Sequence, residues 1–424
     1  MRKVLWVTSF FPPRINVATI RNVKFLKYLS SYGWEAVVIT PKEGCRYTEP
    51  ARHLLSQMDQ SVVRADMPRD PFFYLLDRKD QNRLIAYASY LLNNIIPPDG
   101  HFFWSLLVIN RLKNEIEKHK PDVVYTSCSP FSINLIGAWV KSRYKVPWVT
   151  DFRDLWTLNP ILEKKKWFYS HIVSSFLERK YLGYCDVVIV NTENSKTRML
   201  EKYPFLNGKL RVIQNGFDFE DMPAHEETIQ VLRNSFLFAG SIYRSEYNPS
   251  PLLALLARAG NEHYNKVEWE IHYAGDDGDV FSDLVRRSGM TAKCITHGYL
   301  DQKELYKLIR CMSYVLLCMP STVNTKSWIP ARLYDYMGNK SRIICLAPQG
   351  SEVANILSRY QNAFVLFYEE DADIQIQRLS HFLSRQAGST AVSEEFIINF
   401  DRKVLTGRLV DIFESCIERV QSTL

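Results

Sequence analysis

The chain has 424 residues, 46% hydrophobic and 23% charged, which is the composition of a globular protein with material for two or three domains. Its formal net charge of +7 is too small to indicate nucleic acid, although it suits an anionic ligand or an anionic membrane surface. No run approaches the roughly 20 apolar residues that span a bilayer, and the opening run is too short for a secretory core. We therefore expect a cytoplasmic protein, with any membrane contact peripheral.

The first half alternates short apolar runs with longer amphipathic segments. Residues 18–33 form a helical pattern that places Ile20, Val23, Leu26 and Leu29 on one face and stops at Gly33. Because the strand-like runs are apolar throughout, they indicate a parallel sheet covered by helices on both faces. The expected strands are 3–10, 35–40, 122–128, 147–152, 186–191 and 210–215.

The second half repeats this alternation, with a helical pattern at 301–312. Its expected strands are 235–241, 269–275, 294–299, 314–319, 342–347 and 363–368. Two βαβ series in succession predict an α/β protein with two doubly wound, Rossmann-like domains that face each other across a cleft. We expect domains at 1–216 and 231–395, an acidic, turn-rich linker at 217–230, and a final helix at 396–424 that packs back across the join.

Cysteine usage and acidic runs give weaker indications. The eight cysteines are scattered and form no Cys-x-x-Cys pair, so buried free thiols in a reducing compartment are expected. "GDDGD" (275–279) is interpreted as an acidic turn after a strand, and "DAD" (371–373) follows the last expected strand. Neither is interpreted as a metal site.

Residues 161–182 combine three lysines, Lys164 to Lys166, with Trp167, Phe168 and Tyr169 on a helical pattern. Two interpretations fit this segment: a peripheral bilayer contact, or a helix that covers the sheet with a lysine-rich end. Residues 72–92 share the ambiguity.

Five stretches, in order, carry a family resemblance over essentially the whole chain. They are 10–41, 120–160 with "DFRDLW", 210–218, 236–249 and 329–352 with "IPARLYDY". On these residues the chain resembles the GT-B fold retaining glycosyltransferases of family four, in a subgroup similar to bacterial surface-polysaccharide enzymes. Departures are Ile15 and Asn16 where the family has a glycine pair, and Asp335 and Arg332 where it has glutamate and lysine.

The resemblance implies a nucleoside-diphosphate sugar as donor substrate, no cofactor and no metal. It implies a glycan or lipid-linked acceptor bound by the N-terminal domain and a donor bound by the C-terminal domain, with the anomeric configuration retained. Positive side chains and helix ends then stabilise the leaving diphosphate in place of a cation.

Donor-side candidates lie after strands of the second half. Arg332 has a guanidinium that binds phosphate oxygens in a fork, and Pro330 just inside the helix start would leave free amides facing the same anion. The alternative is a solvated ion pair between Arg332 and Asp335, three residues apart. Asp335 would accept hydrogen bonds from ribose. Arg244 is either a further diphosphate ligand or an ordinary loop arginine. Ser351 and Glu352 stand at the start of a helix and are either donor contacts or, for Ser351, a structural N-cap.

Acceptor-side candidates follow a buried strand of the first half. Asp151 and Asp154 could orient or deprotonate an acceptor hydroxyl, and with Arg153 they could instead form an ion pair that locks the loop. Asn16 and Arg21, in the first loop and first helix, are expected on the same side. Two alternatives to a glycosyltransferase stay open. One is a non-catalytic GT-B protein that binds a nucleotide or scaffolds glycan assembly. The other, a sugar-nucleotide epimerase, fits the fold but not the motifs "DFRDLW" and "IPARLYDY".

Overall fold

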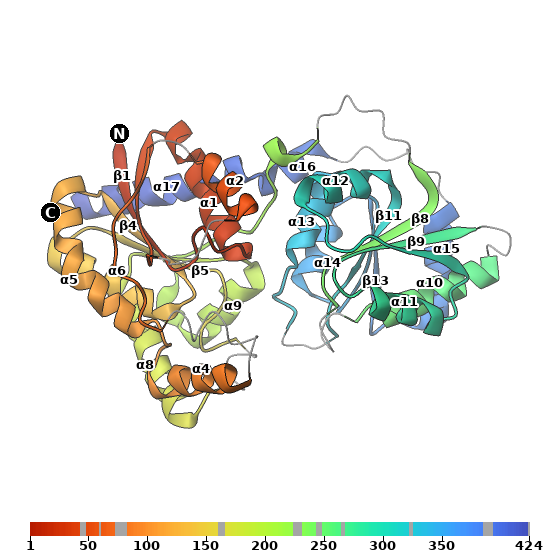
Figure 1. The fold of residues 1–424 in the computed structure, drawn as a ribbon, viewed down its shortest axis with the longest axis horizontal. Helices are drawn as coiled ribbons and strands as arrows, with labels where there is room; N and C mark the ends of the chain where they lie inside the picture. Colours follow the sequence, from red (N-terminus) through yellow and green to blue (C-terminus); the bar gives the residue numbers. More distant parts are fainter. Residues whose placement is uncertain are drawn as a thin grey trace. The chain divides into compact units, whose positions relative to one another are not determined.

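The computed structural model divides into two compact units, each built on its own parallel sheet. The N-terminal unit is Met1–Asn215 with Arg402–Leu424, and the C-terminal unit is Gly216–Asp401. The structure describes residues 1–424 except 43–47, 59–60, 73–82, 160–165, 224–230, 243–247, 264–267, 322–324, 385–392 and 423–424. Figure 1 shows the two sheets with their surrounding helices.

The N-terminal sheet has seven parallel strands in the order β3-β2-β1-β4-β5-β6-β7. Its strands are β1 (Arg2–Thr8), β2 (Trp34–Ile39), β3 (Val62–Arg64), β4 (Val123–Cys128), β5 (Trp148–Phe152), β6 (Val187–Val190) and β7 (Leu210–Val212). Its helices are α1 (Val17–Leu29), α2 (Glu49–Ser56), α4 (Arg83–Ile95), α5 (Phe102–His119), α6 (Asn134–Tyr144), α8 (Phe168–Tyr184), α9 (Glu193–Lys202) and α17 (Arg402–Gln421).

The C-terminal sheet has six parallel strands in the order β10-β9-β8-β11-β12-β13. Its strands are β8 (Leu232–Ala239), β9 (Trp269–Ala274), β10 (Ala292–Thr296), β11 (Met312–Cys318), β12 (Ile343–Ala347) and β13 (Ala363–Phe367). Its helices are α10 (Ser250–His263), α11 (Gly278–Arg287), α12 (Gln302–Cys311), α13 (Ala331–Gly338), α14 (Glu352–Leu357), α15 (Ala372–Ser384) and α16 (Glu394–Ile397).

The predicted class of two doubly wound, Rossmann-like sheets is confirmed, with differences in detail. In α1, Val23, Leu26 and Leu29 are buried as expected, but Ile20 is exposed. The short strand β3 was not predicted. Residues 217–223, expected in a linker, belong to the C-terminal unit. The final helix, α17, begins at Arg402 rather than at residue 396, and residues 396–401 also belong to the C-terminal unit.

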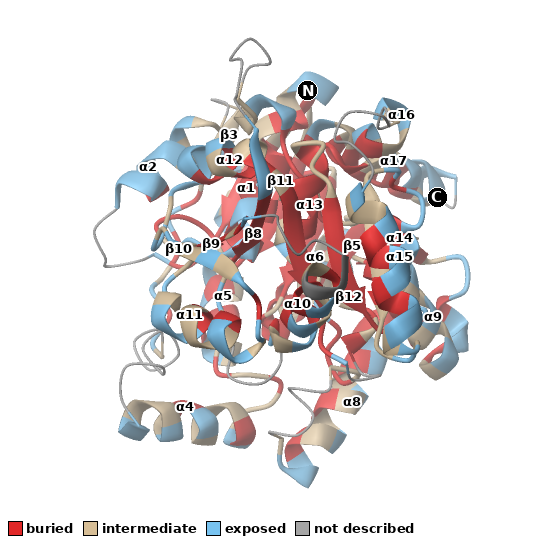
Figure 2. Ribbon diagram, turned by 90° about the vertical axis from the view of Figure 1, so that its right-hand side faces the viewer, coloured by how far each residue is buried: buried red, intermediate tan, exposed pale blue. Residues whose placement is uncertain are grey.

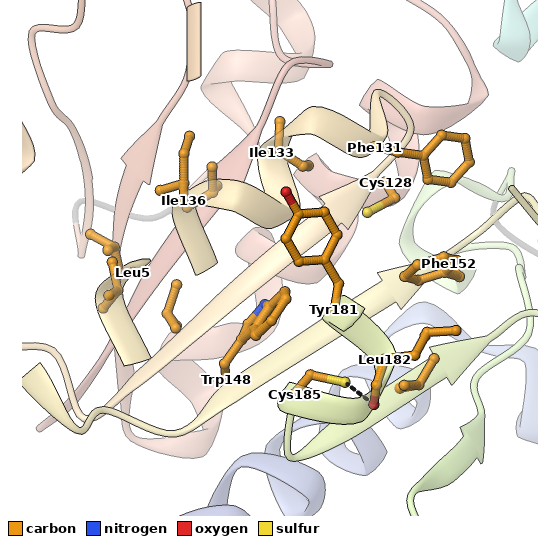
Figure 3. Packing of buried hydrophobic residues seen from close by; sticks show 14 of the residues in the cluster. Leu5, Cys128, Phe131, Ile133, Ile136, Trp148, Phe152, Tyr181, Leu182 and Cys185 are labelled. Atoms are coloured by element: carbon orange, nitrogen blue, oxygen red, sulfur yellow. Dashed lines mark hydrogen bonds between the residues drawn. The ribbon is translucent and has the colours of Figure 1, made fainter. Parts of the chain in front are cut away.

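Each face of the N-terminal sheet carries its own core, as the all-apolar strands require. One face packs against α5, α6, α8 and α9, and the other against α1 and α17. On the first face Trp148 donates from Nε1 to Thr126 Oγ1 at 2.9 Å and meets Tyr181 edge-on (Figure 3). Gly137 of α6 lies against the Trp148 ring, and a Cβ there would collide with it, so this close approach requires glycine.

Figure 2 shows how burial divides the elements: the central strands are buried, whereas α4 is largely exposed or intermediate. None of the helices within the described residues is long and apolar enough to cross a membrane. All seven cysteines that the structure describes are free thiols.

Candidate functional site

The loop after β1 is held by two polar side chains, the exposed Asn16 and the buried Asn22, rather than by glycines. Asn16 caps α1, because its Oδ1 accepts from Thr19 N at 2.9 Å. Asn22, one turn further on, donates to Thr8 Oγ1 and to the Phe10 carbonyl, at 3.0 and 3.2 Å. The non-glycine residues Ile15 and Asn16 therefore occupy a loop whose shape is stabilised from α1.

Arg21 and Asp151 form a buried ion pair in the N-terminal unit. The Arg21 Nε lies 2.9 Å from Asp151 Oδ2, and the two side chains are 1% and 0% exposed. Arg21 also donates to the carbonyls of Ile213 and Gln214, each at 2.9 Å, and to Asn215 Oδ1 at 3.1 Å. One guanidinium thus joins α1, the end of β5 and the segment after β7.

Tyr125 of β4 completes this cluster by donating from its hydroxyl to Asp151 Oδ2 at 2.6 Å. Burial, and then the negative charge of Asp151, raise the pKa of Tyr125 well above its usual value, so the hydroxyl remains a donor. Asp151 is fully buried and bonded to both partners. The ion pair of Asp151 is therefore with Arg21 on α1 and not with Arg153, and the Asp151 side chain is buried away from solvent.

Arg153 and Asp154 lie outside this buried cluster. The Arg153 Nη2 is 2.5 Å from Asp154 Oδ2, and its guanidinium lies over the Phe10 ring at 5.8 Å. Asp154 is exposed, so it is the one of the two predicted carboxylates that a solvent-borne hydroxyl reaches. Arg153 Nε is buried and has no hydrogen-bond partner within the described residues.

In the C-terminal unit, α13 begins one residue later than predicted. Pro330 is the N-cap, with ψ of 140°, and not a first-turn residue. The Leu333 amide donates to the Pro330 carbonyl at 3.0 Å. Ala331 and Arg332 are therefore the first two residues of the first helical turn.

Arg332 and Asp335 are joined as the three-residue spacing suggested. Arg332 Nη1 lies 3.1 Å from Asp335 Oδ2, and the side chains are 30% and 21% exposed. On its other oxygen Asp335 accepts from the Tyr306 hydroxyl at 2.8 Å, and Gln302 donates to that hydroxyl at 2.7 Å. Burial and then the charge of Asp335 raise the pKa of Tyr306, so this hydroxyl also stays protonated.

The remaining donor-side candidates have separate places. Ser351 is fully buried and caps α14 through a bond from the Ala354 amide at 3.3 Å, as a structural cap does. Glu352 is buried in the first turn of that helix. Arg244 lies outside the described residues.

The acidic turn "GDDGD" is hydrogen-bonded to the loop that follows β8. Asp277 Oδ2 accepts from the Ile242 amide at 2.9 Å, and the Tyr273 hydroxyl donates to the Gly240 carbonyl at 2.9 Å. Two side chains from the end of β9 therefore hold the loop that follows β8. No group of three or more His, Cys, Asp or Glu that could hold a metal occurs within the described residues.

Tyr125, Asn215 and Tyr306 were not singled out from the sequence, and Asp277 entered only as part of the acidic turn. Tyr125 carried a signal, since it places a hydroxyl in the middle of a strand expected to be buried, where a polar group needs a partner. The other three depend on contacts across 29 to 194 residues, which spacing along the chain does not reveal.

Comparison with known proteins confirms the GT-B fold and shows similarity to a glycosyltransferase family in the N-terminal half of the chain. Residues 21–221 match the family described as Glycosyltransferase Family 4. An uncharacterized glycosyltransferase of Methanocaldococcus jannaschii is 25% identical over 240 residues, which cover 54% of this chain and 57% of that protein. The chain thus spans little more than half the length of this curated relative.

Solved structures resemble the whole chain at low identity. A glycosyltransferase of Rickettsia africae ESF-5 has a TM-score of 0.61 at 14% identity, covering 98% of each chain. A lipopolysaccharide outer core galactosyltransferase, WaaB, has a TM-score of 0.58 at 12% identity, covering 97% of this chain and 99% of that one. At these identities the likeness establishes the two-domain GT-B fold.

Proposed function

We propose that this chain, which matches glycosyltransferase family 4 over residues 21–221 and has the GT-B fold, transfers a sugar from a nucleoside-diphosphate sugar to a glycan or lipid-linked acceptor. The family match is the observation that carries the proposal, because it falls on the unit that contains the Arg21–Asp151 cluster and Asp154. We propose retention of the anomeric configuration and a role in surface polysaccharide or glycolipid synthesis.

The donor diphosphate is assigned to the start of α13. Arg332 lies in the first turn, where the positive end of the helix dipole and unpaired amides favour an anion. Its guanidinium is partly exposed and held by Asp335, whose own carboxylate is fixed by Tyr306. A charge fixed in place before reaction stabilises the leaving diphosphate without reorganisation. Asp335 would meet the ribose, and Arg244 remains a second diphosphate candidate.

On the acceptor side, Asp154 and Arg153 are proposed to contact the incoming hydroxyl. Arg21, Asp151 and Tyr125 act through the loop after β5, since all three are buried away from solvent. They are positioning residues in this proposal. Asn16 holds the first turn of α1 near the same sheet edge.

The enzyme is proposed to work without a metal or cofactor, in the cytoplasm, with residues 161–182 in a peripheral membrane contact. Arg332 supplies the positive charge that a divalent cation provides elsewhere. The seven described cysteines are free thiols, five of them buried, which fits a reducing compartment.

A non-catalytic nucleotide-binding or scaffold protein is the second candidate. Two observations favour it: Asp151 is sealed in an ion pair, and Arg332 is already paired with Asp335. Such a protein would bind a nucleotide and transfer nothing.

The test is a thermal-shift panel of nucleotides and nucleotide sugars, run with and without EDTA, followed by a transfer assay with each ligand that binds. A true donor at a hundredfold excess over its dissociation constant should stabilise the fold by roughly 2.7 kcal/mol. The shift should be unchanged by EDTA, and sugar should leave the nucleotide in the assay. Binding without any transfer or hydrolysis supports the scaffold candidate, and no shift by any nucleotide contradicts both.

A further inference from the structure

Helix α4 exposes apolar side chains and buries polar ones. Its buried residues are Ser89 and Asn94, whereas Leu84, Tyr87 and Ile95 are among the most exposed large hydrophobic residues of the protein. A helix that covers a sheet from water does the opposite. The side of α4 that faces away from the protein is therefore suited to an apolar environment.

Helix α8 has the same inverted pattern along two rows spaced by four residues. The buried row is Ser170, Ser174 and Glu178, and the exposed row is Phe168, Ile172 and Phe176. Because the rows are offset by two positions, they lie on opposite sides of the helix. Over residues 168–178 the large apolar row faces outward and small or polar residues pack against the protein, whereas Tyr181 and Leu182 further along the helix are buried in the core.

Helices α4 and α8 contact each other at the start of α8. The Trp167 amide donates to Asn94 Oδ1 at 2.7 Å, and its indole Nε1 donates to the Tyr90 hydroxyl at 2.9 Å. Figures 1 and 2 show α4 and α8 next to each other at the same end of the N-terminal unit. We call the six outward residues the α4–α8 face: Leu84, Tyr87, Ile95, Phe168, Ile172 and Phe176.

Lys166 does not belong to this face, although one of the two interpretations of residues 161–182 placed it in a bilayer contact. Its Nζ donates to the Pro98 carbonyl at 3.0 Å, and burial lowers its pKa. Lys164 and Lys165 lie outside the described residues.

Exposed charges on the two helices all have one sign. The only acidic residue of α4 and α8 is Glu178, which is buried, and the exposed charged residues are Arg83, Arg179 and Lys180. Lys180 continues the row of Phe168, Ile172 and Phe176. The α4–α8 face is thus apolar, bordered by aromatic residues and edged with positive charge.

We propose that the α4–α8 face docks on an anionic lipid bilayer, with its apolar side chains among the acyl chains and Lys180, Arg179 and Arg83 at the headgroups. Aromatic residues beside cations suit the bilayer interface. A second copy of the chain fits less well, because a two-fold interface sets the same patch against itself and would bring these cations together.

This inference rests on the proposed function for its purpose, which is to bring the enzyme to a lipid-linked acceptor. Vesicle binding is measured without sugar transfer, however, so either can fail alone. The test is co-sedimentation with vesicles of phosphatidylcholine and phosphatidylglycerol, in parallel with vesicles of phosphatidylcholine only.

The informative variant is Phe168→Ser with Ile172→Ser, which should lower binding to the mixed vesicles by about tenfold or more, since two apolar side chains lose their burial. The matched control is Tyr299→Ser with Ile374→Ser in the C-terminal unit. Its residues are 78% and 52% exposed, against 82% and 50% for Phe168 and Ile172. The control should bind as the wild type does. Lys180→Gln should weaken binding to mixed vesicles roughly fivefold and leave phosphatidylcholine binding unchanged.

Equal binding by both double variants would overturn the proposal, as would equal binding to the two kinds of vesicle. Sedimentation velocity without lipid tests the alternative occupant, a second copy of the chain. A dimer that becomes a monomer in Phe168→Ser with Ile172→Ser, together with no vesicle binding, would assign the face to a second copy.

Discussion

Arg332 can act on the leaving diphosphate or merely pair with Asp335, and the two roles differ in what they do to turnover. If Arg332 stabilises charge that develops in the transition state, Arg332→Ala should lower kcat by about a hundredfold or more, with a smaller change in KM. Asp335→Asn should chiefly raise KM, because a ribose contact changes little along the reaction. Steady-state kinetics with the donor found in the nucleotide panel measures both.

The matched control for Arg332 is Arg286→Ala, which breaks another three-residue pair, Arg286–Asp283, on α11 of the same unit. It should leave both constants as in the wild type. Near-normal turnover in Arg332→Ala would mean that the Arg332–Asp335 pair is only a surface contact. Binding of the diphosphate would then be assigned to Arg244 and the α13 amides.

The Arg21–Asp151 pair gives a second prediction at the residue scale, on stability. Removing one member leaves the other charge buried and unpaired, so Arg21→Ala should destabilise the N-terminal unit by about 3–5 kcal/mol. Denaturant unfolding measures this, and Arg52→Ala, which breaks the exposed Arg52–Glu49 pair in the same unit, is the control that should have little effect. An Asp151→Asn variant with normal stability but little turnover would instead place Asp151 at the acceptor.

At the scale of single elements, the strands were the most predictable part of the molecule. The run "VVIV" of β6 is apolar throughout because that strand is buried along its whole length, and such a run can be recognised in the sequence without knowing which strands lie beside it. The three-residue β3 is too short to show a pattern. Helices α4 and α8 show the limit: periodicity finds an apolar side but does not say whether protein or another medium covers it.

The candidate site was less predictable than the fold, for a physical reason. The spacing along the sequence predicted the contact of Arg332 with Asp335, since residues three apart on a helix are neighbours. The partners of Asp151 lie 130 and 26 residues away, on α1 and β4. Only the strand order, with β1 between β2 and β4 and β5 next to β4, brings them together.

For the whole molecule, the chain divides at two places, Asn215/Gly216 and Asp401/Arg402. The last helix, α17, returns to the N-terminal unit, where Leu405, Leu409 and Phe413 join the core under α1. The stability of the N-terminal unit therefore depends on residues that follow the entire C-terminal unit in the sequence.

Two phenylalanines thirteen positions apart test this division. Phe413 packs on Trp34 and Tyr125 in the N-terminal unit, with ring centroids 5.3 and 5.8 Å away, whereas Phe400 packs on Tyr334 in the C-terminal unit at 5.7 Å. Each change to alanine opens a core cavity and should cost about 3–5 kcal/mol, but in different units. Hydrogen exchange should therefore speed up in β1 and β4 for Phe413→Ala, and in β11 and β12 for Phe400→Ala, because amide protection follows the stability of the unit that must open. If both variants accelerated exchange in the same strands, the chain would not divide at Asp401, and α17 would not be part of the N-terminal core.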